Sequence, residues 1–476
     1  MPLQRFLIPT VAVAVACAVA CATNPATGKK QLMLVSEEQE IAMGRQADAE
    51  VPRAYGVYPD QELQAYVERL GKGLAARSER PALPWSFRVV DDPVVNAFAL
   101  PGGFIYVTRG ILAHFDSEAQ LAAVLGHEIG HVTARHSADQ MSRQQVAMLG
   151  LGVGMIVQPE LQRFASAAQA GLGLLFLKFG RDHEREADSL GLRYMLAGGY
   201  APGEMSGVFR MLDRAGSGGE RLPDWLSTHP SPEDRLQRIE AAIPSPPPQG
   251  TVNRDSYLQR LDGLVVGEDP RQGFFRGSEF LHPELRFRFV FPNGYKLQNR
   301  RDAVVGVSPQ QDAAIALTLA RGDSPAAAAR DFVSQQGIAS PGARRSSLRG
   351  FEAVELSFEA GDQSGSVRGL ALFLADQGRV YRLLGYSVAA RWSEYAREVE
   401  RSLGSYARLT DRSALEAQPA RLALVRLGSD MTITEFAQRY PGGKVETLAL
   451  INQVPANGSL HRGQLAKRVV GGLQPD

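Results

Sequence analysis

The sequence predicts an α+β protein with a mainly helical first domain, a second domain of mixed helices and strands, and a small C-terminal module. Apolar residues recur at helical spacing in the first half of the chain, whereas strict two-residue alternation begins at Leu285. A proline-rich segment at 243–250 separates the two patterns. A chain of 476 residues is expected to form two to four domains. Its formal charge of +1 provides no field that would recruit nucleic acid, so we expect no nucleic-acid partner.

Residues 1–20 have the layout of an export signal, with one basic residue followed by an apolar stretch rich in small residues. The stretch is too short for a confident membrane anchor. It ends in "AVAC" at Cys21, which resembles the bacterial lipoprotein cleavage box, where the cysteine is lipidated and becomes the N-terminus. Cys17 is a second candidate, and ordinary signal cleavage is the alternative. With Ala22 next, the resemblance implies an exported protein in the periplasm, lipid-anchored to the outer membrane.

Capping signals place the helices of the first domain, predicted at 21–242. Ser36 with Gln39 forms a capping box for a helix to about Tyr55, and Ser117 caps a long helix that runs past His136. The remaining elements expected here are a helix from Asp60, a strand at 85–92, two strands or a bent edge strand at 96–108, and a helix at 182–197.

Two apolar patches, 146–157 and 164–177, follow the long helix. The first is shorter than a membrane span, and polar residues separate the two. They are interpreted as buried or interface helices, and a surface resting on a bilayer is the alternative.

Beyond a linker at 243–279, residues 280–410 are predicted to form an α+β accessory domain. This segment has no cluster of histidine, cysteine or acidic residues that suggests catalysis, so a structural or binding role is expected. Its predicted strands lie at 285–291, 303–307, 313–320, 351–358, 366–374 and 379–387, and its predicted helices at 325–336 and 390–403.

Residues 421–470 resemble a LysM module, a β-α-α-β fold that grips N-acetylglucosamine chains. The matching pieces include Gly428, Asp430, Asn452 and "GQL" at 463–465, while "GSDMTITEF" departs from the usual start. The resemblance implies peptidoglycan as a partner. A degenerate packing module is the alternative.

The stretch "HEIGH" at 127–131 carries the chemistry of the first domain. His127 and His131 are four residues apart, about 400° of helical rotation, and therefore lie on one face, where both imidazoles can hold one zinc ion. Glu128 is then placed to take a proton from the zinc-activated water as that water attacks a peptide carbonyl. The alternative is the polar side of an ordinary helix.

Zinc needs a third protein ligand and an open position. "DHEREADSLG" at 182–191 supplies Glu184 and Asp188, four residues apart on one helix face, as a ligand and a carboxylate that orients a histidine. Glu186 and His183 lie off that face and are expected to be surface residues.

Together, "NAFALPGGFIYV", "HEIGH", "EREAD" and "STHPSPEDR" closely resemble the zincin (gluzincin) metallopeptidases that include CAAX prenyl endopeptidases, membrane heat-shock proteases and periplasmic outer-membrane-assembly proteases. "CATNPATGKKQLMLVSEEQEIAMG" resembles the lipoprotein branch of that family. The resemblance implies that His127, His131 and Glu184 bind zinc and that Glu128 is the general base. Asp188 would orient a ligand or donate a proton.

The same resemblance implies that Asn96 and Pro101–Tyr106 form an edge strand on which the substrate lies as an added strand. His229 in "THPSPEDR" is by default a surface or helix-start residue, and the alternative hypothesis makes it a reversible fourth zinc ligand. Arg235 is expected to form a salt bridge or to stabilise the tetrahedral oxyanion.

The sequence thus predicts a zinc-dependent endopeptidase of the bacterial envelope that holds one Zn²⁺ ion and hydrolyses unfolded or misassembled envelope proteins. Two rival functions are a chaperone-like envelope binding protein with a latent zinc site and a peptidoglycan-associated structural factor.

Overall fold

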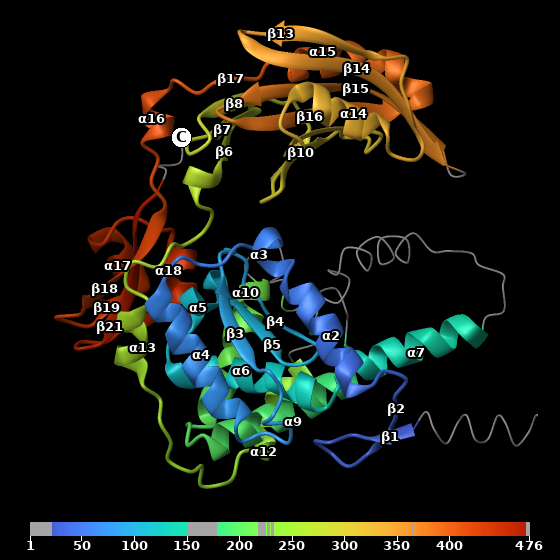
Figure 1. The fold of residues 1–476 in the computed structure, drawn as a ribbon. Helices are drawn as coiled ribbons and strands as arrows, with labels where there is room; N and C mark the ends of the chain where they lie inside the picture. The colour runs from blue at the N-terminus through green and yellow to red at the C-terminus, as the bar shows by residue number, and fades with distance from the viewer. Residues whose placement is uncertain are drawn as a thin grey trace, which may run out of the picture. The chain divides into compact units, whose positions relative to one another are not determined.

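The structure is a computed structural model that divides into two compact units. Unit 1 contains the residues up to Glu268 together with Ala420–Gly471, and unit 2 contains the intervening Asp269–Pro419 (Figure 1). The residues described are 21–150, 179–217, 225, 229, 233–362 and 365–472. The predicted signal, the patch at 164–177 and the end of the patch at 146–157 lie outside them.

Unit 1 is mainly helical, as predicted. Its helices before the unit boundary are α2 (Glu37–Asp48), α3 (Val51–Ala54), α4 (Gln61–Ala75), α5 (Arg109–His114), α6 (Glu118–Thr133), α7 (His136–Gly150), α9 (Arg181–Ala197), α10 (Gly203–Ser217), α12 (Glu233–Ala242) and α13 (Arg254–Arg260). No helix among the described residues is both long and apolar enough to cross a membrane.

The predicted helix starts are confirmed by their caps. Ser36 and Gln39 form the complete capping box that opens α2. Asp60 accepts a hydrogen bond from the Leu63 amide and opens α4. Ser117 likewise accepts one from the Gln120 amide at the start of α6.

The predicted long helix past His136 is wrong, because α6 ends at Thr133 and α7 begins at His136. Arg135 has φ 58°, a left-handed conformation that no α-helix continues through. Its side chain donates to Glu40 Oε2 at 2.9 Å and to the Val35 carbonyl at 2.8 Å. These contacts with α2 and the residue preceding it hold the turn.

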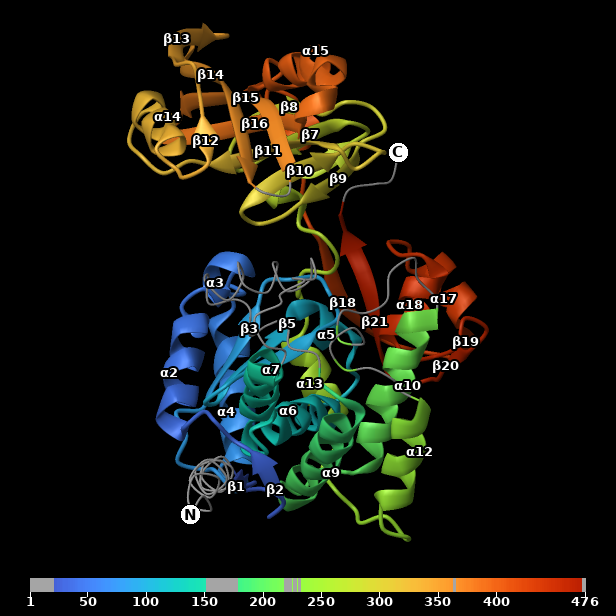
Figure 2. The same cartoon turned by 90° about the vertical axis from the view of Figure 1, so that its right-hand side faces the viewer.

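Two small sheets accompany these helices. The sheet beside α6 has the order β3-β5-β4, with β5 parallel to β3 and antiparallel to β4 (Figure 1; β3 and β5 are also labelled in Figure 2). A hairpin of β1 and β2 forms the N-terminal edge of the described chain. The strands are β1 (Cys21–Thr23), β2 (Lys30–Leu32), β3 (Ser86–Val90), β4 (Ala97–Leu100) and β5 (Phe104–Thr108).

Unit 2 is the predicted α+β fold. An eight-stranded antiparallel sheet has the order β12-β14-β15-β16-β11-β10-β9, with β13 also paired to β14, and a second sheet has the order β17-β8-β7-β6. Its helices and strands are η2 (Pro270–Gln272), β6 (Phe274–Arg276), β7 (Glu279–His282), β8 (Phe287–Val290), β9 (Lys296–Asn299), β10 (Ala303–Val307), β11 (Ala313–Leu319), α14 (Pro325–Val333), β12 (Ile338–Ala339), β13 (Ala343–Leu348), β14 (Phe351–Asp362), β15 (Gly365–Asp376), β16 (Arg379–Val388), η3 (Ala389–Arg391), α15 (Trp392–Leu403), β17 (Ala407–Arg408) and α16 (Arg412–Leu415).

Alternation along β15 divides the core of unit 2 between the two faces of the large sheet. Leu372 and Leu374 belong to the core cluster that contains Val399 of α15. Phe373 belongs to the cluster that contains Phe332 of α14. The two helices therefore cover opposite faces of the sheet.

Residues 420–471 fold in the order two strands, two helices and two strands, and they belong to unit 1. This order alone does not assign the module to a family. The elements are β18 (Ala420–Arg426), β19 (Met431–Thr432), α17 (Ile433–Arg439), α18 (Val445–Ile451), β20 (Ser459–Leu460) and β21 (Leu465–Gly471), with β18 antiparallel to β21.

A buried lysine joins this module to the start of α6. Lys467 is 0% exposed, and its ammonium donates to the carbonyls of Ala113 and Phe115 and pairs with Asp116 at 3.0 Å. A buried ammonium is tolerated only when its hydrogen bonds are satisfied in this way. The module is therefore part of the unit that contains "HEIGH".

The predicted linker, 243–279, differs from the structure, because part of it folds into unit 1. Helix α13 lies within it, and Tyr257, Leu258 and Leu261 are buried in the core of unit 1. The boundary between the units falls at residue 268 because this short helix supplies apolar side chains that pack on unit 1.

Candidate metal centre

Glycine and alanine at helical spacing bring α6 and α9 into backbone contact. A Cβ atom added at Gly191 would lie 2.9 Å from the backbone nitrogen of His127, and one added at Gly130 would lie 2.9 Å from the carbonyl oxygen of Ala187. Real Cβ atoms do not approach this closely, so larger residues would push the helices apart. The small residues thus place the histidines of α6 beside the carboxylates of α9.

Four buried side chains converge at this contact. His127, His131, Glu184 and His229 each offer one ligand atom, and these atoms all lie within 4.8 Å of one another. The Nε2 atoms of His127 and His131 are 3.0 Å apart, and Glu184 Oε1 lies 2.9 Å from His229 Nδ1. All four residues are at most 2% exposed.

The donor set fits a zinc ion. Three imidazole nitrogens and one carboxylate oxygen are the ligands that zinc takes in tetrahedral sites. Without a cation, the facing His127 and His131 nitrogens bring two lone pairs together unless one carries a proton. The structure therefore brings together the three predicted ligands, and it adds His229 to them rather than leaving it on the surface.

Asp188 orients His127 from behind, as the sequence predicts for a carboxylate on the face of Glu184. Its Oδ1 lies 2.9 Å from His127 Nδ1, which leaves Nε2 facing the cluster. Arg235 donates two hydrogen bonds to Asp188, from Nε to Oδ2 at 2.7 Å and from Nη2 to Oδ1 at 2.6 Å. It also pairs with Glu184 Oε2 at 2.9 Å. The salt-bridge alternative for Arg235 is thus the one observed.

The charges around the cluster compensate one another. Burial disfavours ionisation of Asp188, but the Arg235 guanidinium outweighs it and lowers the pKa of the carboxyl to about 2. Burial likewise opposes ionisation of Glu184, yet His229 and the other nearby cations hold its pKa below its ordinary value. Both carboxylates are therefore anionic at neutral pH and suited to a cation and its ligands.

Glu128 lies beside the cluster but is not part of it. It is 1% exposed, and its Oε1 atom is buried without a hydrogen-bond partner among the described residues. His229 Nε2 lies 3.7 Å from this oxygen. Leaving a buried carboxylate oxygen unsatisfied is costly, which is typical of a group reserved for chemistry.

An aromatic contact positions His229. The His229 amide donates to the Trp225 carbonyl at 2.8 Å, one helical turn back, and the two rings stack with centroids 4.7 Å apart. Trp225 also receives the Arg235 guanidinium over its ring, 4.8 Å from the centroid. Trp225 thus links His229 to Arg235, which holds Asp188.

The predicted substrate edge is corrected by the sheet topology. Phe104–Tyr106 lies in β5, which is paired on both sides and cannot accept another strand. Of the strands β4 and β5, the edge strand is β4, which among the described strands pairs with β5 alone. Gly102 and Gly103, both with positive φ, make the turn between β4 and β5, which places β5 in the centre of the sheet and β4 at its edge. Asn96, just before β4, keeps its predicted place beside the edge.

Two expected surface residues prove to be partly buried, and one histidine was missed. Glu186 is only 14% exposed in its side chain and binds His136 at 3.0 Å. His183 is 17% exposed and pairs with Asp139 at 3.0 Å. His136, fully buried, contacts His131. The third histidine of "HEIGHVTARH", His136, was the available signal. On a continuous helix, however, its side chain would point away from His131.

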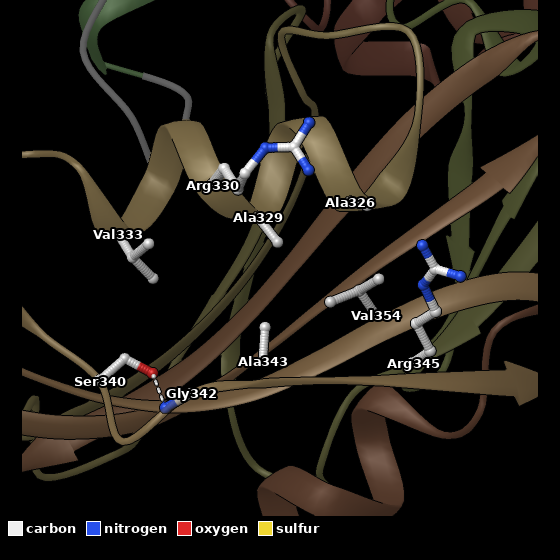
Figure 3. A pocket seen from close by; sticks show the side chains of 9 residues that line it. All are labelled: Ala326, Ala329, Arg330, Val333, Ser340, Gly342, Ala343, Arg345 and Val354. Carbon is white, nitrogen blue, oxygen red and sulfur yellow. Dashed lines mark hydrogen bonds between the residues drawn. The ribbon is translucent and has the colours of Figure 1, made fainter.

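A separate cavity of about 260 Å³ lies in unit 2, between α14 and the β13–β14 hairpin. Figure 3 shows two arginine side chains extending beside an apolar floor. The lining residues are Ala326, Ala329, Arg330, Val333, Ser340, Gly342, Ala343, Arg345 and Val354. None of them is a metal-ligand candidate, so this cavity is not the site of the predicted chemistry.

Residues 61–243 match the model of peptidase family M48. The chain is 37% identical over 210 residues to the mitochondrial metalloendopeptidase OMA1 of Arabidopsis thaliana, covering 43% of this chain and 42% of that protein. It is 31% identical over 264 residues to the beta-barrel assembly-enhancing protease of Yersinia pestis, covering 52% and 53%. A third relative, the OMA1 of Schizosaccharomyces pombe, is 35% identical over 229 residues, covering 46% and 66%.

The chain thus spans between 42% and 66% of the lengths of these curated relatives. The predicted enzyme class, a zinc metalloendopeptidase, is confirmed by the family match and the relatives. The predicted cofactor, one zinc ion, is confirmed by the family together with the four-residue cluster.

Proposed function

Residues 61–243 match the model of peptidase family M48, and from this match we propose that the whole chain hydrolyses unfolded or misassembled proteins of the bacterial envelope. The observation that carries the proposal is the buried convergence of His127, His131, Glu184 and His229 beside the unsatisfied carboxylate of Glu128. The envelope setting is supported by relatives named beta-barrel assembly-enhancing proteases.

His127, His131 and Glu184 are proposed to hold the zinc ion. When bound, zinc polarises a peptide carbonyl and lowers the pKa of water toward neutrality. Glu128 is proposed as the general base, because its Oε1 is buried, has no other hydrogen-bond partner among the described residues and lies beside the ligand atoms. It would accept the proton of the attacking water and then deliver it to the leaving amine.

Asp188 acts in this proposal by orienting His127 rather than by donating a proton to the substrate. Its two oxygens are occupied by His127 and Arg235, and its low pKa leaves it without a proton to donate. Arg235 is placed to keep Asp188 and Glu184 together. Its contacts are directed at these carboxylates, so we assign it no oxyanion role.

His229 is proposed to occupy a fourth ligand position reversibly. Its Nδ1 atom lies 3.4 Å from His127 Nε2 and 2.9 Å from Glu184 Oε1, within the ligand cluster. A closed set of four protein ligands is typical of structural zinc sites, whereas catalysis needs an open position. Displacement of His229 by substrate would convert the first arrangement into the second.

The substrate is proposed to lie along β4 as an added strand. An extended backbone pairs with an edge strand without regard to sequence, which suits substrates that share only a lack of folded structure. Lipid attachment at Cys21 and peptidoglycan contact through 421–470 are separate proposals. Mass spectrometry of the N-terminal peptide and co-sedimentation with purified sacculi test them.

The first experiment measures zinc content and hydrolysis of unfolded casein with the full chain, comparing wild type with Glu128→Gln. We expect one zinc per chain in both and cleavage in the wild type, with at least a hundredfold loss in the variant. Glu62→Gln, on the exposed side of α4, is the matched control and should cleave like the wild type.

The same pair of proteins separates the rival functions. Zinc in both with cleavage in neither would direct attention to His229→Ala, which should release activity if His229 closes the site. Activity unchanged by His229→Ala would contradict the reversible-ligand hypothesis. Binding of unfolded protein that Glu128→Gln leaves intact, without cleavage by any variant, would favour the chaperone-like alternative.

A further inference from the structure

The two ligand histidines of α6 have different hydrogen-bond partners on the side away from the cluster. His127 is oriented directly by a carboxylate, Asp188. His131 instead places its Nδ1 atom 2.9 Å from Nδ1 of a second histidine, His136. The rings meet edge to face, with centroids 4.9 Å apart and an interplanar angle of 78°. This geometry is that of a hydrogen bond between the two ring nitrogens.

Only one arrangement of protons satisfies these contacts. His131 presents Nε2 to the ligand cluster, where a cation requires a lone pair, so its ring proton resides on Nδ1. That proton is donated to Nδ1 of His136, which must therefore carry its own proton on Nε2. The Nε2–H group then donates to Glu186 Oε2 at 3.0 Å. The acceptor at the end of the chain is thus a carboxylate.

This arrangement needs His136 in its singly protonated form, with one ring nitrogen as acceptor and the other as donor. The residue is 0% exposed, so no solvent competes for either nitrogen. A doubly protonated ring would offer His131 a donor instead of an acceptor and would break the bond between them.

The carboxylate is fixed by the N-terminal hairpin. Asn24 donates through Nδ2 to Glu186 Oε2 and to the Ala134 carbonyl, each at 3.2 Å. Its Oδ1 accepts the amides of Ala26 and Thr27, and the side chain is almost fully buried. Lys29 pairs with Glu186 Oε1 at 3.2 Å from an exposed position. Asn24 thus joins Glu186 to the turn between α6 and α7.

His136 reaches this position only because the helix is broken before it. The left-handed Arg135 ends α6 and turns the chain, so that His136 opens α7 beside the second nitrogen of His131. His183 stacks on the far side of His136, with centroids 4.3 Å apart and an interplanar angle of 19°. His183 binds Asp139 and makes no contact with Glu186 among those described.

We propose that His136 and Glu186 are positioning residues of the metal centre, which fix the tautomer and orientation of His131 through a histidine–histidine–glutamate relay anchored by Asn24. The inference rests on the proposed zinc site and adds to it the device that sets one ligand. Groups behind a metal-bound histidine commonly raise the metal affinity by about 10–100-fold. The relay also ties the segment that follows Cys21 to the metal centre.

The test measures zinc affinity of the metal-free full chain by competition with a chelator of known affinity. Glu186→Ala and His136→Phe should weaken zinc binding by about 10–100-fold. Glu186→Gln retains a carbonyl acceptor and should lose less than Glu186→Ala. His183→Phe is the matched control, because it keeps a ring stacked on His136 but lies outside the relay. Its affinity should stay within threefold of the wild type.

NMR of the histidine ring nitrogens supplies a readout that packing alone would not change. The zinc-loaded wild type should show His131 protonated on Nδ1 and His136 on Nε2, whereas His136 in Glu186→Ala should populate both tautomers. Circular dichroism of the metal-free variants checks folding. Should His136→Phe fail to fold, the graded series at Glu186 decides the question.

Affinities of folded Glu186→Ala and His136→Phe within threefold of the wild type would overturn the relay. So would a His131 proton on Nε2 in the zinc-loaded wild type. Failure of the wild type to bind zinc would instead overturn the proposed function. The two failures are therefore distinguished by the wild-type titration alone.

Discussion

The two units of this molecule differ in how many ionised side chains they bury. In unit 1, the ionised side chains of Asp188, Glu184 and Arg235 are nearly inaccessible and lie around the candidate metal centre. In unit 2, the described core is built from aromatic and aliphatic side chains, and its salt bridges lie mostly at the surface. Burying charge is costly unless it is paired, so unit 1 sacrifices stability for a site that unit 2 does not maintain.

The largest expected effect comes from breaking the buried pairs of unit 1. Arg235→Ala leaves two buried carboxylates without their cation and should lower the free energy of unfolding of unit 1 by about 3–5 kcal/mol. Arg344→Ala removes a surface pair of unit 2, with the arginine 78% exposed, and should change it little. Denaturant unfolding followed by hydrogen exchange reports each unit separately. Equal effects would erase the contrast between the units.

Zinc should stabilise one unit only. At a thousandfold excess of free zinc over its Kd, unit 1 should gain about 4 kcal/mol, because the ion binds the folded ligand cluster. Hydrogen exchange of α6 and α9 should slow on zinc addition, while β14–β16 should be unaffected. Slowed exchange in unit 2 would show that the units share the effect of the ion.

Acid should weaken unit 2 through a single histidine. Burial lowers the pKa of His282 from 6.5 to about 4, and its Nδ1 accepts the Leu285 amide. The unfolded state binds the proton more readily, so stability falls as the pH drops from about 6.5 toward 4, by about 2 kcal/mol. His282→Gln should flatten the pH dependence of the stability of unit 2. The stability of unit 1 should still depend on pH, because His114 there has a similarly lowered pKa. Thermal unfolding across this pH range is the measurement.

The smallest effects are expected at the cavity of unit 2. Arg330→Ala and Arg345→Ala alter exposed side chains for which the structure shows no ion pair, so each should change stability by less than about 0.5 kcal/mol. Zinc affinity and casein hydrolysis should be unchanged. A fall in hydrolysis would implicate this cavity in handling substrate and would weaken the contrast between the units.

Local patterns predicted the parts of the site that are close in sequence. His127, His131 and Glu128 follow from spacing on one helix, and Glu184 with Asp188 from spacing on another. The role of His136 was hidden because a single left-handed residue, Arg135, ends the helix, and no periodicity reveals such a break. The edge strand was misplaced by one hairpin turn for a similar reason, because register depends on pairing rather than on composition.

The strands and helices that were predicted in unit 2 lie within a few residues of observed ones, because alternation and capping are local signals. The short strands β6, β7, β9, β12, β13 and β17 were not predicted. The docking of residues 420–471 on unit 1 was beyond prediction. Lys467 and Asp116 are far apart in the sequence, and a single lysine in an otherwise ordinary strand does not indicate its partner.

The lysine that joins β21 to the start of α6 also imposes an order on biosynthesis. Its partner carbonyls at Ala113 and Phe115 are made early, but Lys467 emerges only after all of unit 2. At roughly 5–20 residues per second, the ribosome needs about 20–70 s to make the chain between Phe115 and Lys467. During this time the helix that contains "HEIGH" lacks its buried ammonium clamp. Unit 1, which contains the candidate metal centre, is therefore completed only after unit 2 has been synthesised.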